Sequence, residues 1–234
     1  MAKDSTFENI DVLVLCGGKG TRLRPVVSDK PKALADVGGK PFIEILLDIL
    51  ASEGFHRVIL GVGYLKEEVK NHFQANPRKD LKIEFSEEDT PLGTGGAVKK
   101  AKPLIKSDHF LVLNGDSLAS VDFNEFYQSH LDKKAMLSLA LANVADDSSS
   151  YGRVMLASDN RIASFNEKQN LVSAGVYLMR KDVFDFMPAE NSFSLEHDFF
   201  PKITEASYGF VSDKGFIDIG TPERYRQANR LFSK

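Results

Sequence analysis

Three glycines and two cations stand close together near the N-terminus, and their types and spacing could bind an anion. The glycines lie in segment 16–22, directly after the apolar run 12–15, while Arg22 and Lys32 are ten residues apart. Glycines let the backbone approach a ligand closely, and a turn of this kind directs several N–H groups at one anion. The segment therefore predicts a polyphosphate site that begins where a strand ends.

Two familiar interpretations of a glycine-rich turn do not fit this segment. The spacing matches neither Gly-x-Gly-x-x-Gly nor the P-loop pattern that ends in Gly-Lys-Ser/Thr. A tight turn from strand to helix without any ligand remains an alternative. The two cations, together with Pro25 and Pro31 at fixed offsets, favour the phosphate site.

Two aspartates stand where strands are expected to end. Asp116 closes the run Asn-Gly-Asp directly after the apolar segment 110–113, and Asp218 lies between two isoleucines. Ligands bind at the carboxyl ends of strands in open α/β sheets, and a carboxylate among apolar residues is costly unless it is paired or holds a metal. A capping role for Asp116 and a solvent-facing position on an edge strand for Asp218 are the alternatives.

The elements that must position these residues alternate between strand and helix patterns. Apolar runs at 12–15, 57–62 and 110–113, and segment 82–87, where Ile83 and Phe85 alternate with charged residues, predict strands. Helical spacing covers 42–53, 66–73 and 96–105. This rhythm predicts a doubly wound α/β sheet. The second half predicts a hairpin over 151–168, strands at 172–179 and 216–219, and a last helix from 222 to about 232, after the N-cap Thr221.

Composition excludes several classes of protein. The chain has 234 residues, a net charge of −3, 42% hydrophobic residues and one cysteine. These values predict one globular domain, no basic surface for nucleic acid and no intrachain disulfide. No stretch approaches the roughly 20 apolar residues of a membrane span. The polar N-terminus and the single cysteine favour a cytoplasmic protein. We expect a monomer or a homo-oligomer. The five histidines show no metal-ligand spacing.

Segment 17–41 resembles the signature of the sugar-nucleotide pyrophosphorylases, a nucleotidyltransferase family. The family pattern Gly-Gly-x-Gly-Thr-Arg-Leu-x-Pro, then Pro-Lys, then Lys-Pro, is present at 17–25, 31–32 and 40–41. The resemblance extends to the last helix. It implies a three-layer, Rossmann-like fold of the nucleotide-diphospho-sugar transferase type with a mainly parallel mixed sheet. One domain would span 1–234, without the β-helical C-terminal domain whose hexapeptide repeats are missing here.

The resemblance also implies roles for individual residues. Segment 91–97 is similar to the family's nucleobase loop, and Glu87 just upstream is a further candidate acceptor for base or sugar. The residues expected around the nucleotide are Cys16, where the family more often has Ala, and Gly17, Gly18, Gly20, Thr21, Glu87, Leu92, Gly93, Thr94, Gly95, Asn114 and Gly115. Arg22, Lys32 and Lys168 would neutralise phosphate charge, and Asp116 and Asp218 would share Mg²⁺. Glu167, Ser173 and Gly175 would contact the sugar, with Ser173 in place of the usual Asn.

The implied reaction joins a nucleoside triphosphate to a sugar 1-phosphate and releases pyrophosphate. Within the family, the chain looks most like the bacterial D-glycero-α-D-manno-heptose 1-phosphate guanylyltransferases, which implies GTP as the nucleotide. Mannose 1-phosphate guanylyltransferases and muramate 1-phosphate uridylyltransferases are the alternatives. A non-catalytic nucleotide-sugar sensor is disfavoured because the Arg, Lys and Asp positions are all filled. A dinucleotide dehydrogenase is disfavoured because neither Asp36 nor Asp48 ends a second strand.

Overall fold

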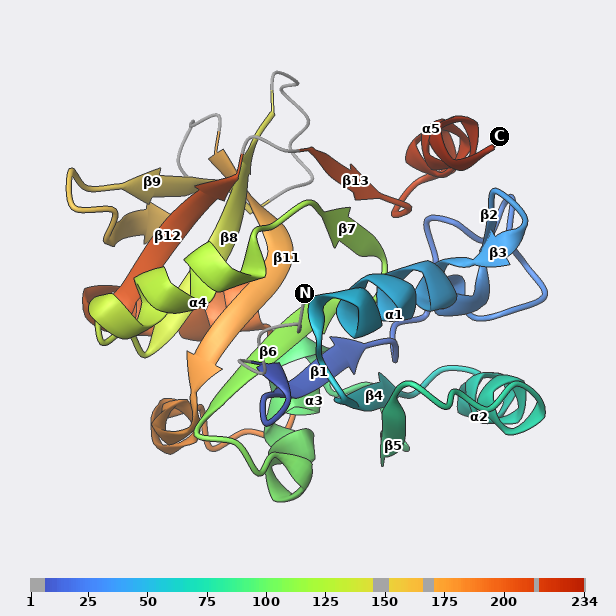
Figure 1. Cartoon of the computed structure of the whole chain (residues 1–234), viewed down its shortest axis with the longest axis horizontal. Coiled ribbons are helices and arrows are strands. Elements are labelled where there is room, and N and C mark those ends of the chain that lie inside the picture. The colour runs from blue at the N-terminus through green and yellow to red at the C-terminus, as the bar shows by residue number, and fades with distance from the viewer. Residues whose placement is uncertain (1–6, 145–151, 166–170, 213–214, 234) are drawn as a thin grey trace.

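A seven-stranded mixed sheet forms the centre of the protein, seen in the computed structural model in Figure 1. The structure describes residues 7–144, 152–165, 171–212 and 215–233. The strands, in their order across the sheet, are β12 (Ser207–Ser212), β8 (Leu137–Asn143), β11 (Leu171–Arg180), β6 (His109–Asn114), β1 (Asp11–Leu15), β4 (Arg57–Val62) and β5 (Lys82–Glu87). β11 runs antiparallel to both of its neighbours, and the other neighbouring strands are parallel.

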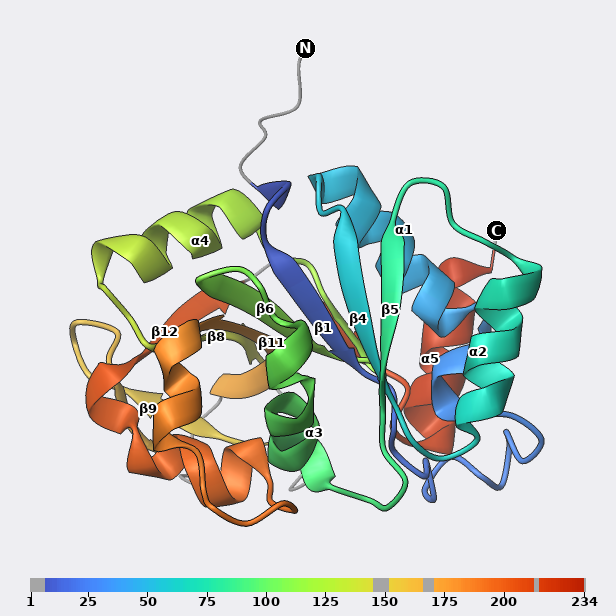
Figure 2. The same ribbon diagram turned by 90° about the horizontal axis from the view of Figure 1, so that it is seen from below.

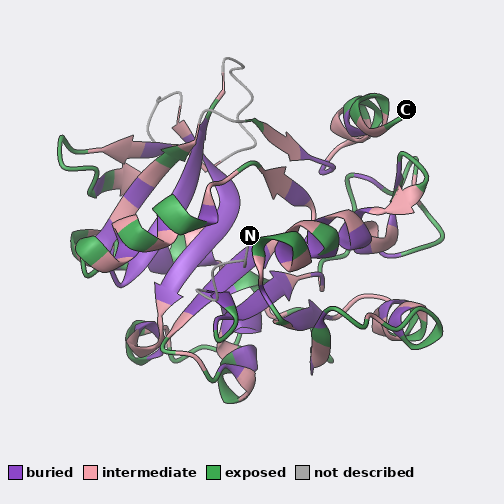
Figure 3. Ribbon diagram, in the orientation of Figure 1, coloured by how far each residue is buried: buried purple, intermediate pink, exposed green. Residues whose placement is uncertain are grey.

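Helices cover both faces of this sheet (Figure 2). α1 (Phe42–Glu53) and α4 (Phe123–Asp132) pack with Val12 and Val14 of β1 on one face. α3 (Gly93–Ala101) and the short helical turns between 181 and 206 pack with Leu13 on the other. The apolar runs that predicted the strands are therefore covered on both sides, and Figure 3 shows β8, β11 and β6 buried along most of their length.

A third apolar cluster holds the C-terminus beside the sheet. The hairpin β2 (Asp36–Val37) and β3 (Lys40–Pro41) packs on α5 (Pro222–Phe232). α5 begins as its sequence predicts, since the Thr221 side chain accepts a hydrogen bond from the Arg224 amide. Just before it, β13 (Phe216–Asp218) pairs antiparallel with β7 (Ser117–Ala119), so the end of the chain meets the end of β6.

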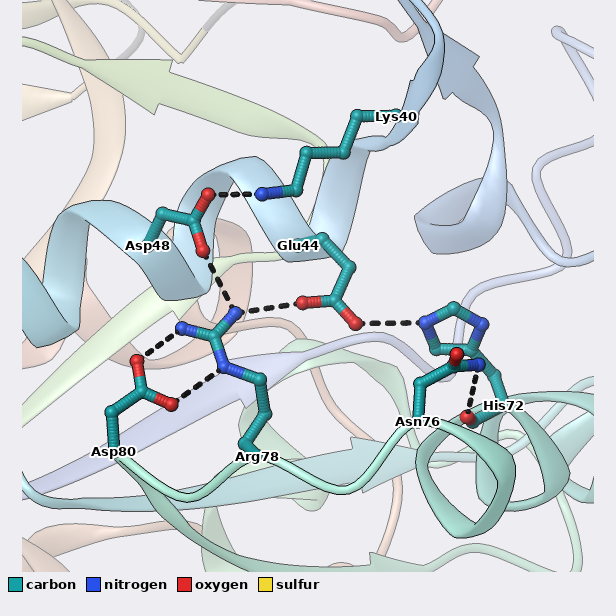
Figure 4. A network of polar contacts seen from close by, with 7 residues as sticks. All are labelled: Lys40, Glu44, Asp48, His72, Asn76, Arg78 and Asp80. Atoms are coloured by element: carbon teal, nitrogen blue, oxygen red, sulfur yellow. Dashed lines mark hydrogen bonds and ion pairs between the residues drawn. The ribbon is translucent and has the colours of Figure 1, made fainter.

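An ion-pair network ties α1 to α2 (Lys66–Ala75) and to the turn before β5 (Figure 4). Arg78 is its centre, and hydrogen bonds to carboxylates, that of Asp80 first, raise the pKa of Arg78 above its ordinary value. Its other partners are Glu44 at 2.7 Å and Asp48 at 2.9 Å. The network thus fixes α1, whose first turn leads out of the β2–β3 hairpin.

The buried His130, which contacts the half-buried His109, predicts that the protein loses stability in mild acid. His130 is 0% exposed and lies between His109 Nδ1 at 3.0 Å and Ser138 Oγ at 2.8 Å. Burial, followed by the charges of His109 and Arg180, lowers the pKa of His130 to about 3. The unfolded chain binds this proton near pH 6.5, so the contribution is complete above that pH and is lost as the pH falls toward 3.

We expect the free energy of unfolding to fall by about 2 kcal/mol between pH 7 and pH 5 through this group. Urea denaturation of the wild type and of His130→Asn at both pH values measures the effect. The variant should be less stable at pH 7 but should lose less between the two pH values. An equal loss in both proteins would contradict the assignment to His130.

Most predicted elements are present with nearly the predicted bounds, and the doubly wound arrangement is confirmed. The predicted helix at 96–105 begins three residues earlier, as α3, and changes to a 3₁₀ turn after residue 101. The hairpin is present as β9 (Val154–Leu156) and β10 (Ile162–Phe165), while residues 151 and 166–168 of the predicted range lie outside the described residues. The helix α4 and the strands β2, β3, β7, β8 and β12 were not predicted.

Candidate active site

A cleft of about 390 Å³ opens at the carboxyl ends of β1 and β6. The glycine-rich loop 16–22 forms one wall, and loop 88–94, which leads into α3, forms another. The structure brings most of the predicted nucleotide and phosphate residues together there: Cys16, Gly17, Gly18, Gly20, Thr21, Arg22, Lys32, Leu92, Gly93, Thr94, Asn114, Gly115 and Asp116.

The glycine-rich loop presents free N–H groups to this cleft. In the described part of the chain, none of the backbone amides from Gly17 to Arg22 donates a hydrogen bond to another group. The loop is held instead through its oxygens, because the Gly17 carbonyl accepts from Tyr64 N and the Gly20 carbonyl accepts from Leu23 N. Several unpartnered N–H groups beside Arg22 make the concave, positive site that an anion requires.

Cys16 begins this loop as a buried wall residue. Burial, followed by the negative charge of Asp116, raises the pKa of the Cys16 thiol to about 12. The thiol therefore keeps its proton at neutral pH and is a poor nucleophile. Its place in the cleft is that of a small apolar side chain.

Lys32, Asp116 and Asp218 gather around Gly220 at the end of the cleft. Lys32 Nζ lies 2.5 Å from Asp116 Oδ2. A Cβ on Gly220 would stand 2.7 Å from Asp218 Oδ1 and 3.6 Å from Lys32 Nζ. The β7–β13 pairing places Asp218 opposite Ser117, the residue that follows Asp116. The sequence separates these two aspartates by about a hundred residues, and this short pairing brings them together.

Asp218 does not point into solvent from an edge strand. Only 7% of the residue is exposed, and its carboxylate accepts from Gly220 N at 2.7 Å and pairs with Arg224 Nη1 at 3.3 Å. This ion pair explains how the charge is tolerated beside two isoleucines. Asp218 therefore has a structural partner as well as a place beside the cleft.

The donor set at this end fits a magnesium ion that also binds phosphate oxygens. Among the described residues, no group of three or more His, Cys, Asp or Glu side chains could hold a metal. Asp116 lines the cleft together with the phosphate loop, and Asp218, which is not part of the lining, is brought next to it by the β7–β13 pairing. Magnesium in nucleotide sites typically takes one or two carboxylates and completes its shell with substrate phosphates and water.

The prediction that Glu87 lines the nucleotide site is not met, and Glu88 lines the cleft in its place. Glu87 faces α2, where it pairs with Lys66 and Lys70. The Glu88 carboxylate accepts from Leu92 N at 3.1 Å, and burial raises its pKa. A Cβ on Gly17 would lie 2.6 Å from Glu88 Oε1, so Glu88 packs directly between the two loops. Neighbouring residues on a strand face opposite sides, and the sequence did not show which one faced the cleft.

Gly95, another predicted nucleotide residue, faces the protein interior. A Cβ there would lie 2.1 Å from the Phe193 ring, and one on Gly96 would lie 2.2 Å from the Asn191 carbonyl oxygen. Because these two glycines have no side chain, segment 191–193 packs directly against the start of α3. Gly93, with φ of +69°, and Thr94 supply the part of this motif that does line the cleft.

Two of the predicted sugar residues, Ser173 and Gly175, lie outside the cleft lining. Ser173 is 8% exposed, and its hydroxyl donates to the Tyr177 hydroxyl at 3.2 Å, so it faces the core. Gly175 lies behind Asn114, since its Cβ would stand 2.8 Å from Asn114 Nδ2. Glu167 and Lys168 fall outside the described residues.

Known proteins with similar sequences share this fold and most of its length. The family model described as nucleotidyl transferase matches residues 11–234. A D-glycero-α-D-manno-heptose 1-phosphate guanylyltransferase from Aneurinibacillus thermoaerophilus is 37% identical over 94% of this chain and 97% of its own length. A mannose-1-phosphate guanylyltransferase from Mycobacterium tuberculosis is 33% identical over 92% of this chain, which spans 62% of that longer protein.

A solved structure agrees over nearly the whole chain. HddC from Yersinia pseudotuberculosis, complexed with GMP-PN, is 36% identical, with a TM-score of 0.85 over 96% of this chain and all of its own. The three-layer fold with a mainly parallel mixed sheet is therefore shared with that protein. In the described residues, no helix is both long and apolar enough to cross a membrane.

Proposed function

The chain belongs to the nucleotidyl transferase family, and we propose that it transfers GMP from GTP to D-glycero-α-D-manno-heptose 1-phosphate with release of pyrophosphate. The observation that carries this proposal is the identity of 37% over 97% of a guanylyltransferase with that acceptor. The cleft supports this proposal, because a loop of free amides, Lys32 and the Asp116 carboxylate line it, and the β7–β13 pairing brings Asp218 next to Asp116. The related mannose and muramate enzymes are the alternatives that experiment must separate.

The reaction needs no general base. A phosphate oxygen of the sugar 1-phosphate attacks the α-phosphorus of GTP, and the bond between that phosphorus and the β-phosphate bridging oxygen breaks. The nucleophile is already an anion, so the protein's contribution is to align two polyanions and neutralise charge. The amides of 17–22, Arg22 and Lys32 would hold the β- and γ-phosphates and stabilise the departing pyrophosphate. Lys168 would bring the acceptor phosphate close despite repulsion.

Asp116 and Asp218 would hold Mg²⁺, which supplies charge neutralisation at the phosphates when bound. Lys32 pairs with Asp116 in the free protein, and it can turn to a phosphate once a cation compensates that carboxylate. Glu88 would replace Glu87 as the acidic residue at the nucleotide, because it borders both loops of the cleft. We place the reaction in the cytoplasm, which suits the single buried cysteine.

A screen for pyrophosphate release tests this function. GTP, UTP, CTP, ATP and dTTP are each combined with heptose, mannose, glucose and muramate 1-phosphates. The expected result is the highest kcat/KM for GTP with the manno-configured heptose. A higher value for UTP with a hexose or muramate 1-phosphate would reject the substrates but retain the reaction class. Release from GTP alone, without any sugar phosphate, would reject the transferase.

Lys168→Ala is expected to raise the KM for the sugar 1-phosphate about tenfold or more, with a much smaller effect on the KM for GTP. One lost charge-assisted hydrogen bond to phosphate corresponds to this magnitude. Lys79→Ala, on the exposed turn before β5, is the matched control. Titration of GTP into the variant locates the lysine, because an equal loss of GTP affinity would place Lys168 on the triphosphate instead.

A further inference from the structure

The Tyr177 hydroxyl is a buried polar centre between the sheet and the cleft. Tyr177 is 1% exposed, and its hydroxyl donates to Glu196 Oε1 at 2.8 Å. The Tyr177 hydroxyl also accepts a hydrogen bond from the Ser173 hydroxyl at 3.2 Å and one from the side chain of Asn114. Asn114 lines the cleft two residues before Asp116, so a chain of hydrogen bonds runs from Glu196 to the cleft wall.

The hydroxyl proton of Tyr177 sets the direction of each of these hydrogen bonds. Burial, followed by the Glu196 carboxylate, holds the pKa of Tyr177 well above its ordinary value, so the hydroxyl stays protonated. Its single proton goes to Glu196, which can only accept. Tyr177 therefore offers only lone pairs to Asn114, and the Asn114 NH₂ group must face it. The Asn114 Oδ1 atom is buried with no hydrogen-bond partner among the described residues, so the amide is held from the Tyr177 side alone.

The backbone around Tyr177 also depends on this centre. The pairing of β11 with β8 shifts in register between Ser173 and Tyr177, and Gly175 within that bulge has φ of +72°. Gly175 lies against Asn114, while Ser173 donates to Tyr177 and accepts weakly from Gly175 N at 3.4 Å. The bulge and the Asn114 amide are thus held by the same hydroxyl.

Glu196 is itself anchored on the nucleotide side of the cleft. It ends a segment, 192–196, that we call the linking segment. Phe193 N donates to the Leu92 carbonyl at 3.0 Å, and Leu195 N donates to Thr94 Oγ1 at 2.9 Å. The Phe193 carbonyl accepts from Gly95 N at 2.9 Å. The linking segment is therefore hydrogen-bonded to segment 91–95, where α3 begins, while the Glu196 carboxylate reaches across to β11.

We propose that Glu196 is a positioning residue: through the Tyr177 hydroxyl it fixes the Asn114 amide and the β11 bulge, and so holds the acceptor side of the cleft in register with the nucleotide loop. This inference rests on the proposed function for what the two sides bind. No residue of β11 lines the cleft, so its bulge acts on the cleft only through the Asn114 amide, which we take as the edge of the acceptor side. The linking segment joins parts of the chain that are about a hundred residues apart in sequence.

Kinetics of Glu196→Gln and Tyr177→Phe test the positioning role. Each is expected to raise the KM for the sugar 1-phosphate about tenfold and to raise the KM for the triphosphate by less, because the backbone anchors to segment 91–95 remain. The double variant should be no worse than Tyr177→Phe alone, since both act through one hydroxyl. Glu53→Gln and Tyr127→Phe, at the opposite end of the sheet, are the matched controls. Equal changes in both KM values, or additive effects, would overturn the proposal.

Hydrogen exchange gives a reading that does not need activity. Deuterium uptake in Glu196→Gln should rise in peptides that cover 171–177 and 114–119, and stay unchanged in peptides that cover 91–98. If the wild type released no pyrophosphate from any substrate pair, the proposed function would fail, yet this pattern would still test the mechanical link. Unchanged uptake at 171–177 in a variant with an unaltered Tm would overturn the link itself. Glu196→Asp, which keeps the charge but shortens the reach, should show the same rise.

Discussion

Asp116→Asn is expected to lower kcat about a thousandfold while the fold survives. The amide keeps the size of the side chain but removes the charge that faces Lys32 and would hold a cation at the phosphates. Steady-state pyrophosphate release over a magnesium titration measures the loss, and circular dichroism checks the fold. Asp132→Asn, on the exposed end of α4, is the control for an equivalent change outside the cleft. Full activity at saturating magnesium would remove Asp116 from the metal site.

Asp218 needs a separate experiment because it has a structural partner. Asp218→Asn is expected to lower kcat by several orders of magnitude, as for Asp116. Arg224→Gln removes the ion pair but keeps the Asp218 carboxylate. If Asp218 acts on the metal, Arg224→Gln should retain most of its activity. If both variants lose activity and Tm to the same extent, the aspartate serves the packing of α5 rather than catalysis.

Arg22→Ala is expected to lower kcat about a hundredfold with little change in the KM for the sugar 1-phosphate. Arg22 is exposed in the cleft wall, and no carboxylate in the described part of the chain pairs with it. Its charge is free for the leaving pyrophosphate, whose negative charge grows in the transition state. Arg24→Ala is the matched control, because Arg24 stacks over Tyr64 at 4.9 Å and does not line the main cleft. An unchanged kcat with a raised sugar KM would contradict the role of Arg22.

Local sequence signals predicted those elements, and those parts of the site, whose residues are close together in the sequence. Residues 57–62 form a strand whose apolar side chains are buried in the sheet, and residues 82–87 form its edge strand, where Ile83 and Phe85 are half-buried. Thr221 caps α5 as its type predicts. The residues of the glycine-rich loop are consecutive in the sequence, so they all lie at the cleft, as predicted. The missed helix α4 is weakly apolar and begins at the cap Asp122 amid polar residues, so its period was inconspicuous.

The remainder depends on which face of an element meets the cleft, and that is a property of tertiary packing. Glu87 and Glu88 differ by one position on a strand end, yet only Glu88 lies between the two loops. Gly95 appeared suited to a base contact and instead makes room for Phe193, a residue about a hundred positions away. Ser173 faces Tyr177 because β11 bulges there, which no local pattern announces. Such contacts arise only when the second half of the chain folds onto the first.

The central claim is that a sugar-phosphate oxygen attacks the α-phosphorus of the triphosphate, and isotope transfer tests it most directly. The enzyme is supplied with GTP and with heptose 1-phosphate whose non-bridging phosphate oxygens carry ¹⁸O. Mass spectrometry then measures the ¹⁸O content of both products. The account predicts that all of the label stays in the nucleotide-sugar, including its new bridging oxygen, and that pyrophosphate carries none. Label in pyrophosphate, or release of unlabelled inorganic phosphate in its place, would contradict the account.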